Sequence, residues 1–91
     1  MTDRLHVCIE GRVQGVGFRY ATQRHALQLG LSGWVRNRVD GCVEAEFEGD
    51  RDELQQMLEW CREGPAFASV THVDEEWEAG PSRYDSFRIR G

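Results

Sequence analysis

A short segment near the amino terminus, residues 11–19, combines glycines with an arginine in a pattern that suits an anion. Gly11, Gly15 and Gly17 can adopt backbone conformations that bring several amide N–H groups toward one point. A helix expected directly after the loop would add unpaired N–H donors and the positive end of its dipole. Arg19 would add a guanidinium whose forked donors match phosphoryl oxygens. The segment is therefore a candidate phosphate-binding loop.

This loop differs from the two better-known phosphate loops. A Walker loop requires Lys followed by Ser or Thr, and the dinucleotide fingerprint requires a third glycine where Tyr20 stands. Nucleotide binding is therefore not supported. A glycine-rich loop alone is equally compatible with a tight turn that contains an exposed arginine, so the loop by itself does not decide between the two interpretations.

Asn37 is a polar residue on a strand face that is otherwise apolar. It shares one face of an expected strand with Val35 and Val39, where burial of an unpaired amide costs about 1 to 3 kcal/mol. Two explanations stay open at this point. Asn37 either bonds a neighbouring loop and holds a hairpin together, or it contacts a ligand.

The elements before the hairpin follow from hydrophobic periodicity. Leu5, Val7 and Ile9 alternate with polar residues and predict a strand that ends near Gly11. A helix is expected over residues 19–31, and its apolar stripe is complete only if the turn between Ala21 and Leu29 is filled by His25 or Ala26.

The rest of the chain predicts a hairpin, a helix and two strands. Strands around residues 35–39 and 43–47 flank Asp40-Gly41, a two-residue hairpin signal. Asp50 can cap a helix with Glu53 at its third position, and Gly64-Pro65 ends it. Its apolar residues at helical spacing are Leu54, Met57, Leu58 and Cys61. Strands over residues 70–77 and 84–89 follow, separated by the turn at 80–82.

The resulting order is βαββαβ, with room for one further strand. Two helices that cover one face of an antiparallel sheet of four to five strands define an α+β, ferredoxin-like split βαβ sandwich. A chain of 91 residues supports one hydrophobic core. We therefore expect residues 1–91 to form a single domain.

Charge and composition restrict the partners and the compartment. A net charge of −5 and a pI near 5.1 disfavour phosphodiester backbones and anionic membranes. The first twelve residues lack the apolar core of a signal peptide, and no later run reaches membrane-spanning length. We expect a cytoplasmic protein with neither nucleic-acid nor membrane partners.

No metal site or cofactor is expected. Three cysteines fit neither a disulfide framework nor a zinc site, although Cys8 and Cys42 could fall on adjacent strands. The acidic residues of 74–78 would alternate between the two faces of a strand, which favours a solvated edge. The histidines lack the spacing of metal ligands; they are His6, His25 and His72.

Residues 11–19, GRVQGVGFR, and residues 33–49, GWVRNRVDGCVEAEFEG, resemble the two signature segments of the acylphosphatase family. The resemblance extends over nearly the whole chain and implies a metal-independent, cofactor-free enzyme. Its expected reaction is hydrolysis of the carboxyl–phosphate anhydride of small acyl phosphates to carboxylate and inorganic phosphate. A monomer is the simplest expectation, although the sequence does not fix the oligomeric state.

The same resemblance implies roles for individual residues. Arg19 would bind the substrate phosphate, and Asn37 would orient the attacking water. The assisting backbone amides would be those of Gln14, Gly15, Val16, Gly17 and Phe18. The water's proton would pass to the phosphate oxygens of the substrate, since neither segment assigns a side chain as base.

Other functions compatible with the pattern stay open. A noncatalytic ferredoxin-like binding module, for example one that binds RNA, would share the fold. RNA recognition, however, needs stacking aromatic residues on exposed strands. The strand faces expected to be exposed instead carry His6, Cys8, Glu10, Glu44, Glu46 and Glu48. An acylphosphatase-like domain of a larger carbamoyl-transfer enzyme would carry the same motifs. A phosphate sensor would keep Arg19 without needing Asn37.

Overall fold

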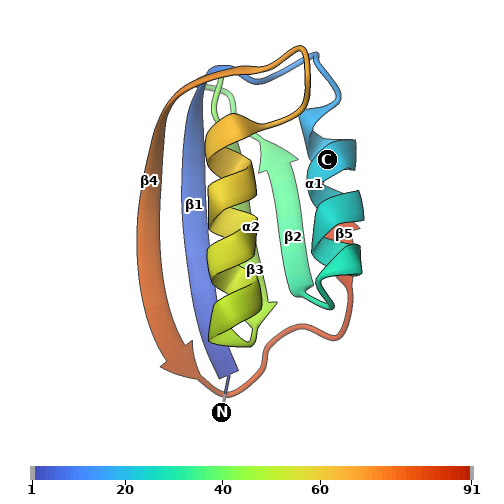
Figure 1. Ribbon diagram of the computed structural model, residues 1–91, viewed down its shortest axis with the longest axis vertical. Helices are drawn as coiled ribbons and strands as arrows, with labels where there is room; N and C mark the ends of the chain where they lie inside the picture. Colours follow the sequence, from blue (N-terminus) through green and yellow to red (C-terminus); the bar gives the residue numbers. More distant parts are fainter. Residues whose placement is uncertain (1, 91) are drawn as a thin grey trace.

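The computed structural model describes residues 2–90 and contains a five-stranded sheet with two helices on one of its faces (Figure 1). The strands are β1 (Thr2–Arg12), β2 (Ser32–Asn37), β3 (Val43–Gly49), β4 (Ser69–Gly80) and β5 (Phe87–Ile89). The helices are α1 (Phe18–Gln28) and α2 (Arg51–Glu63). The strand order is β4-β1-β3-β2-β5, which leaves β4 and β5 at the edges. The expected α+β, ferredoxin-like arrangement is confirmed.

The sheet is antiparallel except at one edge. β1 pairs with β3 and β4, and β2 pairs with β3, all in antiparallel register, whereas β5 runs parallel to β2. β4 and β5 follow one another in sequence but lie at opposite edges, and the chain between them crosses the lower end of the sheet in Figure 1. The sheet is therefore mixed and not antiparallel throughout as expected, because β5 starts at the same end of the molecule as β2.

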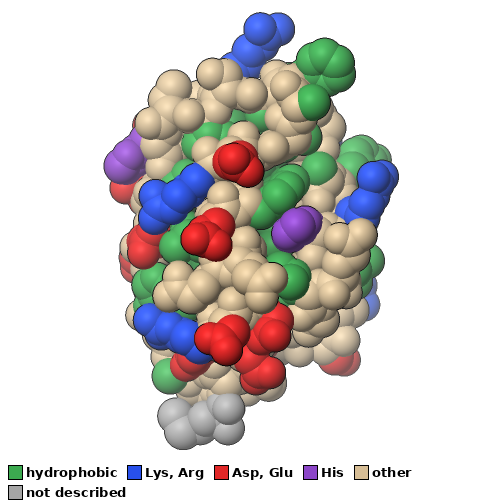
Figure 2. Space-filling model, in the orientation of Figure 1, with side chains coloured by type: hydrophobic (Ala, Val, Ile, Leu, Met, Phe, Trp, Pro, Cys, Tyr) green, Lys and Arg blue, Asp and Glu red, His purple; other side chains and the backbone are tan. Residues whose placement is uncertain are grey.

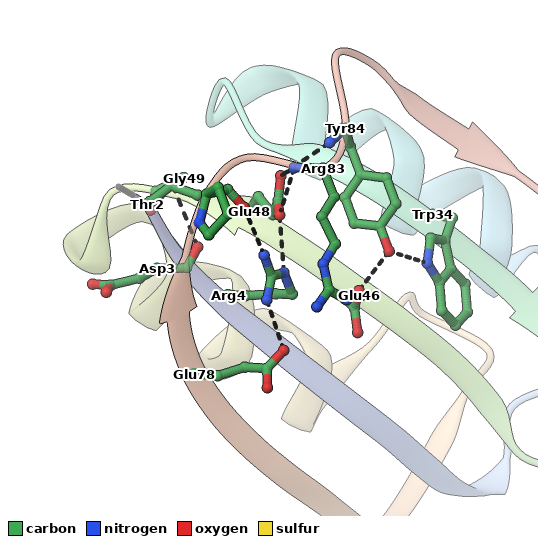
Figure 3. A network of polar contacts seen from close by, with 11 residues as sticks. Thr2, Asp3, Arg4, Trp34, Glu46, Glu48, Gly49, Glu78, Arg83 and Tyr84 are labelled. Atoms are coloured by element: carbon green, nitrogen blue, oxygen red, sulfur yellow. Dashed lines mark hydrogen bonds and ion pairs between the residues drawn. The ribbon is translucent and has the colours of Figure 1, made fainter.

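The chain that crosses from β4 to β5 is held by a buried carboxylate (Figure 3). Glu48 is only 2% exposed and accepts hydrogen bonds from the backbone N–H groups of Arg83 (2.9 Å) and Tyr84 (3.1 Å). Nε of Arg4 donates to the same carboxylate at 2.9 Å. Since these N–H groups bond a side chain, the strand predicted from residue 84 begins only at Phe87. The expected exposure of Glu48 was wrong.

The hydrophobic core lies between the sheet and the helices. Every second residue of the inner strands faces the helices, and burial of one such side chain stabilises the fold by about 1.5 to 3 kcal/mol. The core residues from the strands are Leu5, Val7, Ile9, Val35, Val43, Ala45, Phe47, Val73 and Phe87, and those from the helices are Phe18, Ala26, Leu54, Met57, Leu58 and Cys61. α1 packs over β2 and β5, and α2 over β1 and β4. This packing fixes the start of α1 relative to β2.

α1 is shorter than the helix predicted over residues 19–31. The N–H of Gly30 bonds the carbonyl of Leu27 at 3.1 Å, and that of Leu31 bonds Ala26 at 2.9 Å. These two bonds form a Schellman motif, which closes the helix after Gln28. Leu31 lies outside the helix and is buried in the core. Ala26 fills the apolar stripe as one of the two expected candidates.

α2 confirms the predicted bounds and apolar face, and all four of its predicted apolar residues are buried. Asp50 precedes the helix as predicted, but its side chain makes no capping hydrogen bond. Acidic side chains gather at the lower end of the molecule in Figure 2, the end at which α2 begins in Figure 1. Asp52 and Glu53 lie in the first turn of α2, where their negative charge interacts favourably with the positive end of the helix dipole. Neither helix within residues 2–90 has the length and hydropathy to cross a membrane.

The hairpin between β2 and β3 is confirmed, but its loop is longer than the predicted two-residue turn. β2 ends at Asn37, and the N–H of Arg38 bonds the carbonyl of Cys42 at 2.8 Å. The N–H of Gly41 bonds the carbonyl of Arg38 at 3.2 Å, which turns the chain through residues 39–41. Val39 is fully exposed at the loop tip, so the expectation that it shares a strand face with Asn37 was wrong.

Candidate functional site

The loop between β1 and α1 has the backbone that an anion-binding loop requires. Gly15 and Gly17 have φ angles of 77° and 76°, a left-handed conformation that other residues adopt at a cost. Val13 and Phe18 flank the loop and are each 1% exposed, so both of its ends are anchored in the core. Gly17 is the N-cap of α1, which directs the unpaired N–H groups of the first helical turn toward this loop.

The loop, the start of α1 and the end of β2 enclose a small cavity of about 100 Å³. Pockets for drug-sized ligands measure roughly 300 to 1,000 Å³, so this cavity suits a group of the size of a phosphoryl. Its lining residues are Val13, Gly15, Gly17, Phe18, Arg19, Tyr20 and Asn37. The structure thus brings Arg19 and Asn37 together, although 17 positions separate them in the sequence. Val16 and Gln14 do not line the cavity.

Arg19 supplies the positive charge of the cavity. It lies in the first turn of α1 and is partly buried. Within residues 2–90, ion pairs are formed by Arg4, Arg36, Arg38 and Arg62 but not by Arg19. Its guanidinium is therefore available to an anion in the cavity.

Asn37 offers a buried acceptor without a partner. It is the last residue of β2, opposite Val43, and shares the helix-facing side of the strand with Val35. Its Oδ1 is buried and accepts no hydrogen bond from any residue in the range 2–90. An unpaired buried acceptor costs about 1 to 3 kcal/mol. The purely structural explanation, in which this oxygen bonds a neighbouring loop, therefore lacks the bond that it requires.

Gln14 contributes through its side chain, a contact that sequence reasoning missed. Its Nε2 donates to the carbonyl of Arg38 at 2.7 Å and to that of Cys42 at 3.0 Å. These two residues also bond one another and close the β2–β3 loop. Gln14 thus ties the phosphate-loop candidate to the hairpin that carries Asn37. The acceptors are backbone carbonyls, which every residue possesses, so no residue pattern could have revealed this bridge.

The chemistry of the lining suits an anion. The cavity presents one guanidinium, a carboxamide and backbone amides, and no carboxylate, imidazole or thiol is among its lining residues. Positive and neutral donors of this kind bind phosphoryl oxygens, whereas metal ions require the anionic or imidazole ligands that this lining lacks. The arrangement can neutralise a phosphoryl group and hold a water beside it.

Comparison with known proteins agrees with this geometry. The family model for acylphosphatase matches residues 5–89 of the chain. The acylphosphatase of Trichormus variabilis is 59% identical over 87 residues, which cover 96% of this chain and 85% of that protein. The crystal structure of acylphosphatase from Bacillus subtilis superposes with a TM-score of 0.94 at 37% identity, covering 98% of this chain and 99% of that one.

A more distant likeness extends to a larger protein. The structure of full-length HypF superposes with a TM-score of 0.86 at 23% identity over the whole of this chain and 12% of HypF. That likeness shows a shared fold alone. Architecture and cavity together define a small α+β protein with a glycine-rich loop before its first helix, and by sequence the chain belongs to the acylphosphatase family.

Proposed function

We propose that this protein hydrolyses the carboxyl–phosphate anhydride of small acyl phosphates, with Arg19 and the loop amides as the phosphate site and Asn37 as the residue that orients water. The observation that carries the proposal is that Asn37, whose buried Oδ1 has no hydrogen-bond partner within residues 2–90, lines the same cavity as Arg19. Membership of the acylphosphatase family supports the reaction class.

In this mechanism the phosphoryl oxygens occupy the loop. The amides of residues 14–18 and the forked guanidinium of Arg19 donate to them and neutralise charge that redistributes during transfer. A water donates one hydrogen bond to Oδ1 of Asn37, which directs an oxygen lone pair at phosphorus in line with the leaving group. Positioning and electrostatics are thus the protein's main contributions.

The bond changes require little further assistance. A bond forms between the water oxygen and phosphorus, and the bridging P–O bond breaks, with its electron pair leaving on the carboxylate. That carboxylate has a conjugate acid with a pKa of about 4 to 5, so no general acid is needed. The water's proton passes to a phosphoryl oxygen of the substrate, because no carboxylate or imidazole lines the cavity.

The good leaving group also supports a reaction that proceeds without metal or other cofactor. We further propose a cytoplasmic monomer that acts on a small molecule and has no nucleic-acid or membrane partner. The net charge of −5 supports the absence of polyanionic partners. The odd number of cysteines, without any close pair, fits a reducing compartment better than a secreted disulfide framework.

The test is steady-state hydrolysis of benzoyl phosphate in the presence of a chelator, with p-nitrophenyl phosphate as an ester control. We expect turnover of the anhydride alone. Asn37→Ala lowers kcat by on the order of 100-fold while inorganic phosphate inhibits as before, and Arg19→Ala lowers kcat/KM by on the order of 1,000-fold or more. Arg24→Ala, an exposed arginine of the same helix, is the matched control and retains full activity.

Two results would contradict the proposal. Folded wild-type protein that binds phosphate without hydrolysing the anhydride would identify a binding module. Normal turnover by Asn37→Ala would remove the assigned role of the carboxamide and leave the water unplaced.

A further inference from the structure

The face of the sheet that the helices leave uncovered carries a cluster of three metal-ligating side chains. His6 and Cys8 are two residues apart on β1, so both point away from the helices. Cys8 lies directly opposite Glu44 of β3 in the strand register. A ring nitrogen, the thiol sulfur and a carboxylate oxygen of these residues all lie within 4.8 Å of one another.

The donor set and its spacing suit a transition metal. Imidazole nitrogen, thiolate sulfur and carboxylate oxygen are the ligands of Zn²⁺, whereas Ca²⁺ and Mg²⁺ take oxygen ligands. Zinc bond lengths place tetrahedral ligand atoms about 3.3 to 3.8 Å apart. The three ligand atoms, all within 4.8 Å of one another, lie close to this range.

The first ligand pair is already oriented. Nε2 of His6 lies 2.7 Å from Oε2 of Glu44, and the two side chains are 28% and 12% exposed. Arg36 bonds the other carboxylate oxygen at 2.7 Å and so holds Oε2 toward the imidazole.

Cys8, the third ligand, can lose its hydrogen bond from Arg38 without leaving that guanidinium unpaired. Nη1 of Arg38 donates to Sγ of Cys8 at 3.2 Å, and a metal ion must displace it. Arg38 is 39% exposed and also pairs with Asp40 at 2.9 Å, so it keeps an anionic partner after displacement. Asp74 lies opposite Cys8 on β4 and adds negative charge beside the thiol.

We propose that His6, Cys8 and Glu44 form a binding site for a divalent transition metal ion of the zinc class on the uncovered face of the sheet. The carboxylate and the thiolate neutralise the charge of the ion. On binding, the metal–sulfur bond forms as the thiol releases its proton to the buffer, and the imidazole coordinates through Nε2 with its own proton on Nδ1.

This site is separate from the cavity proposed for hydrolysis. Asn37 shares the helix-facing side of the sheet with Val35, whereas His6, Cys8 and Glu44 point to the other side. The sequence alone predicts no metal site here, because the three residues lie on two strands and their spacing matches no linear zinc motif. Only the pairing of β1 with β3 brings them together.

The experiment is titration of the reduced, full-length protein with Co²⁺ in phosphate-free buffer, followed by absorption spectroscopy. We expect one Co²⁺ per chain, a thiolate-to-cobalt charge-transfer band and loss of the band when Zn²⁺ is added. Cys8→Ser abolishes the band, and His6→Ala weakens Co²⁺ binding by on the order of 10-fold or more. Cys42→Ser and His72→Ala remove a neighbouring thiol and imidazole and leave the titration unchanged.

The wild-type spectrum alone can overturn the proposal, even if a variant fails to fold. A cobalt complex without a thiolate band, or no binding at all, overturns the proposal. So does an unchanged band in folded Cys8→Ser, and so does loss of the band in Cys42→Ser with Cys8 intact.

Discussion

The bridge made by Gln14 yields a prediction that separates loop geometry from substrate contact. Gln14→Ala removes two hydrogen bonds, of 2.7 and 3.0 Å, that tie the loop before α1 to the β2–β3 loop. Each hydrogen bond contributes about 0.5 to 1.5 kcal/mol, so the substitution removes about 1 to 3 kcal/mol of the free energy that holds the two loops together. If that free energy is needed to align Arg19 with Asn37, kcat/KM falls by roughly 5-fold to 150-fold.

The assay is hydrolysis of benzoyl phosphate, with kcat and KM determined separately. Gln14→Glu is the sharper variant, because its carboxylate has the same shape but presents an acceptor to two carbonyl oxygens. We expect it to lose at least as much activity as Gln14→Ala. Gln28→Ala, an exposed glutamine at the end of α1, is the matched control. If Gln14→Ala and Gln14→Glu both stay within two-fold of wild type, the bridge does not position the site.

Three further predictions concern the fold. Glu48→Gln lowers the free energy of unfolding in urea by about 3 kcal/mol, because it breaks a buried ion pair with Arg4; an unchanged midpoint would contradict this. Burial alone raises the pKa of Glu48, but the N–H groups of Arg83 and Tyr84 and the guanidinium of Arg4 hold this pKa below its usual value of about 4.3. The stability that these hydrogen bonds provide is therefore complete above a pH of about 4.3 and is lost as the pH falls through the pKa of Glu48 in the folded protein. The slope of the free energy of unfolding against pH in this range should be smaller in Glu48→Gln. Met57→Ala costs about 2 to 5 kcal/mol of stability in the same assay, since Met57 is fully buried; a loss below 1 kcal/mol would refute the packing described. Burial raises the pKa of Cys61 to about 12, so a thiol reagent should modify Cys8 and Cys42 in the native protein and reach Cys61 only after unfolding; rapid native labelling of three thiols would show otherwise.

The sequence was most informative where the determinants are local. The alternation of Leu5, Val7 and Ile9 and the helical spacing of Leu54 and Met57 set the buried faces of β1 and α2, and both predictions were confirmed. The two motifs also identified the loop and Asn37, which the structure places around one cavity. Local patterns succeed here because one buried face per element suffices to set its register.

Two of the wrong predictions, for Glu48 and for the start of β5, arise from contacts with a segment that is distant in the sequence. The third, for Val39, arises from the hairpin turn. Glu48 alternates like an exposed strand residue, yet the crossing segment covers it and donates two backbone N–H groups to it. The same bonds delay the start of β5 until Phe87. Val39 continues the period of β2, but the bond between Arg38 and Cys42 closes the hairpin before it. The partners of Glu48 lie 35 and 36 positions further along the chain, whereas the bond that excludes Val39 is local to the hairpin.

The most direct test of the proposed mechanism is hydrolysis of benzoyl phosphate in water labelled with heavy oxygen, followed by mass spectrometry of both products. If Asn37 directs water at phosphorus, the label enters inorganic phosphate and the benzoate stays unlabelled. The residual activity of Asn37→Ala should show the same product labelling at a much lower rate. Label in the benzoate of the wild-type reaction would mean attack at the carbonyl carbon and would contradict the assigned geometry of the site.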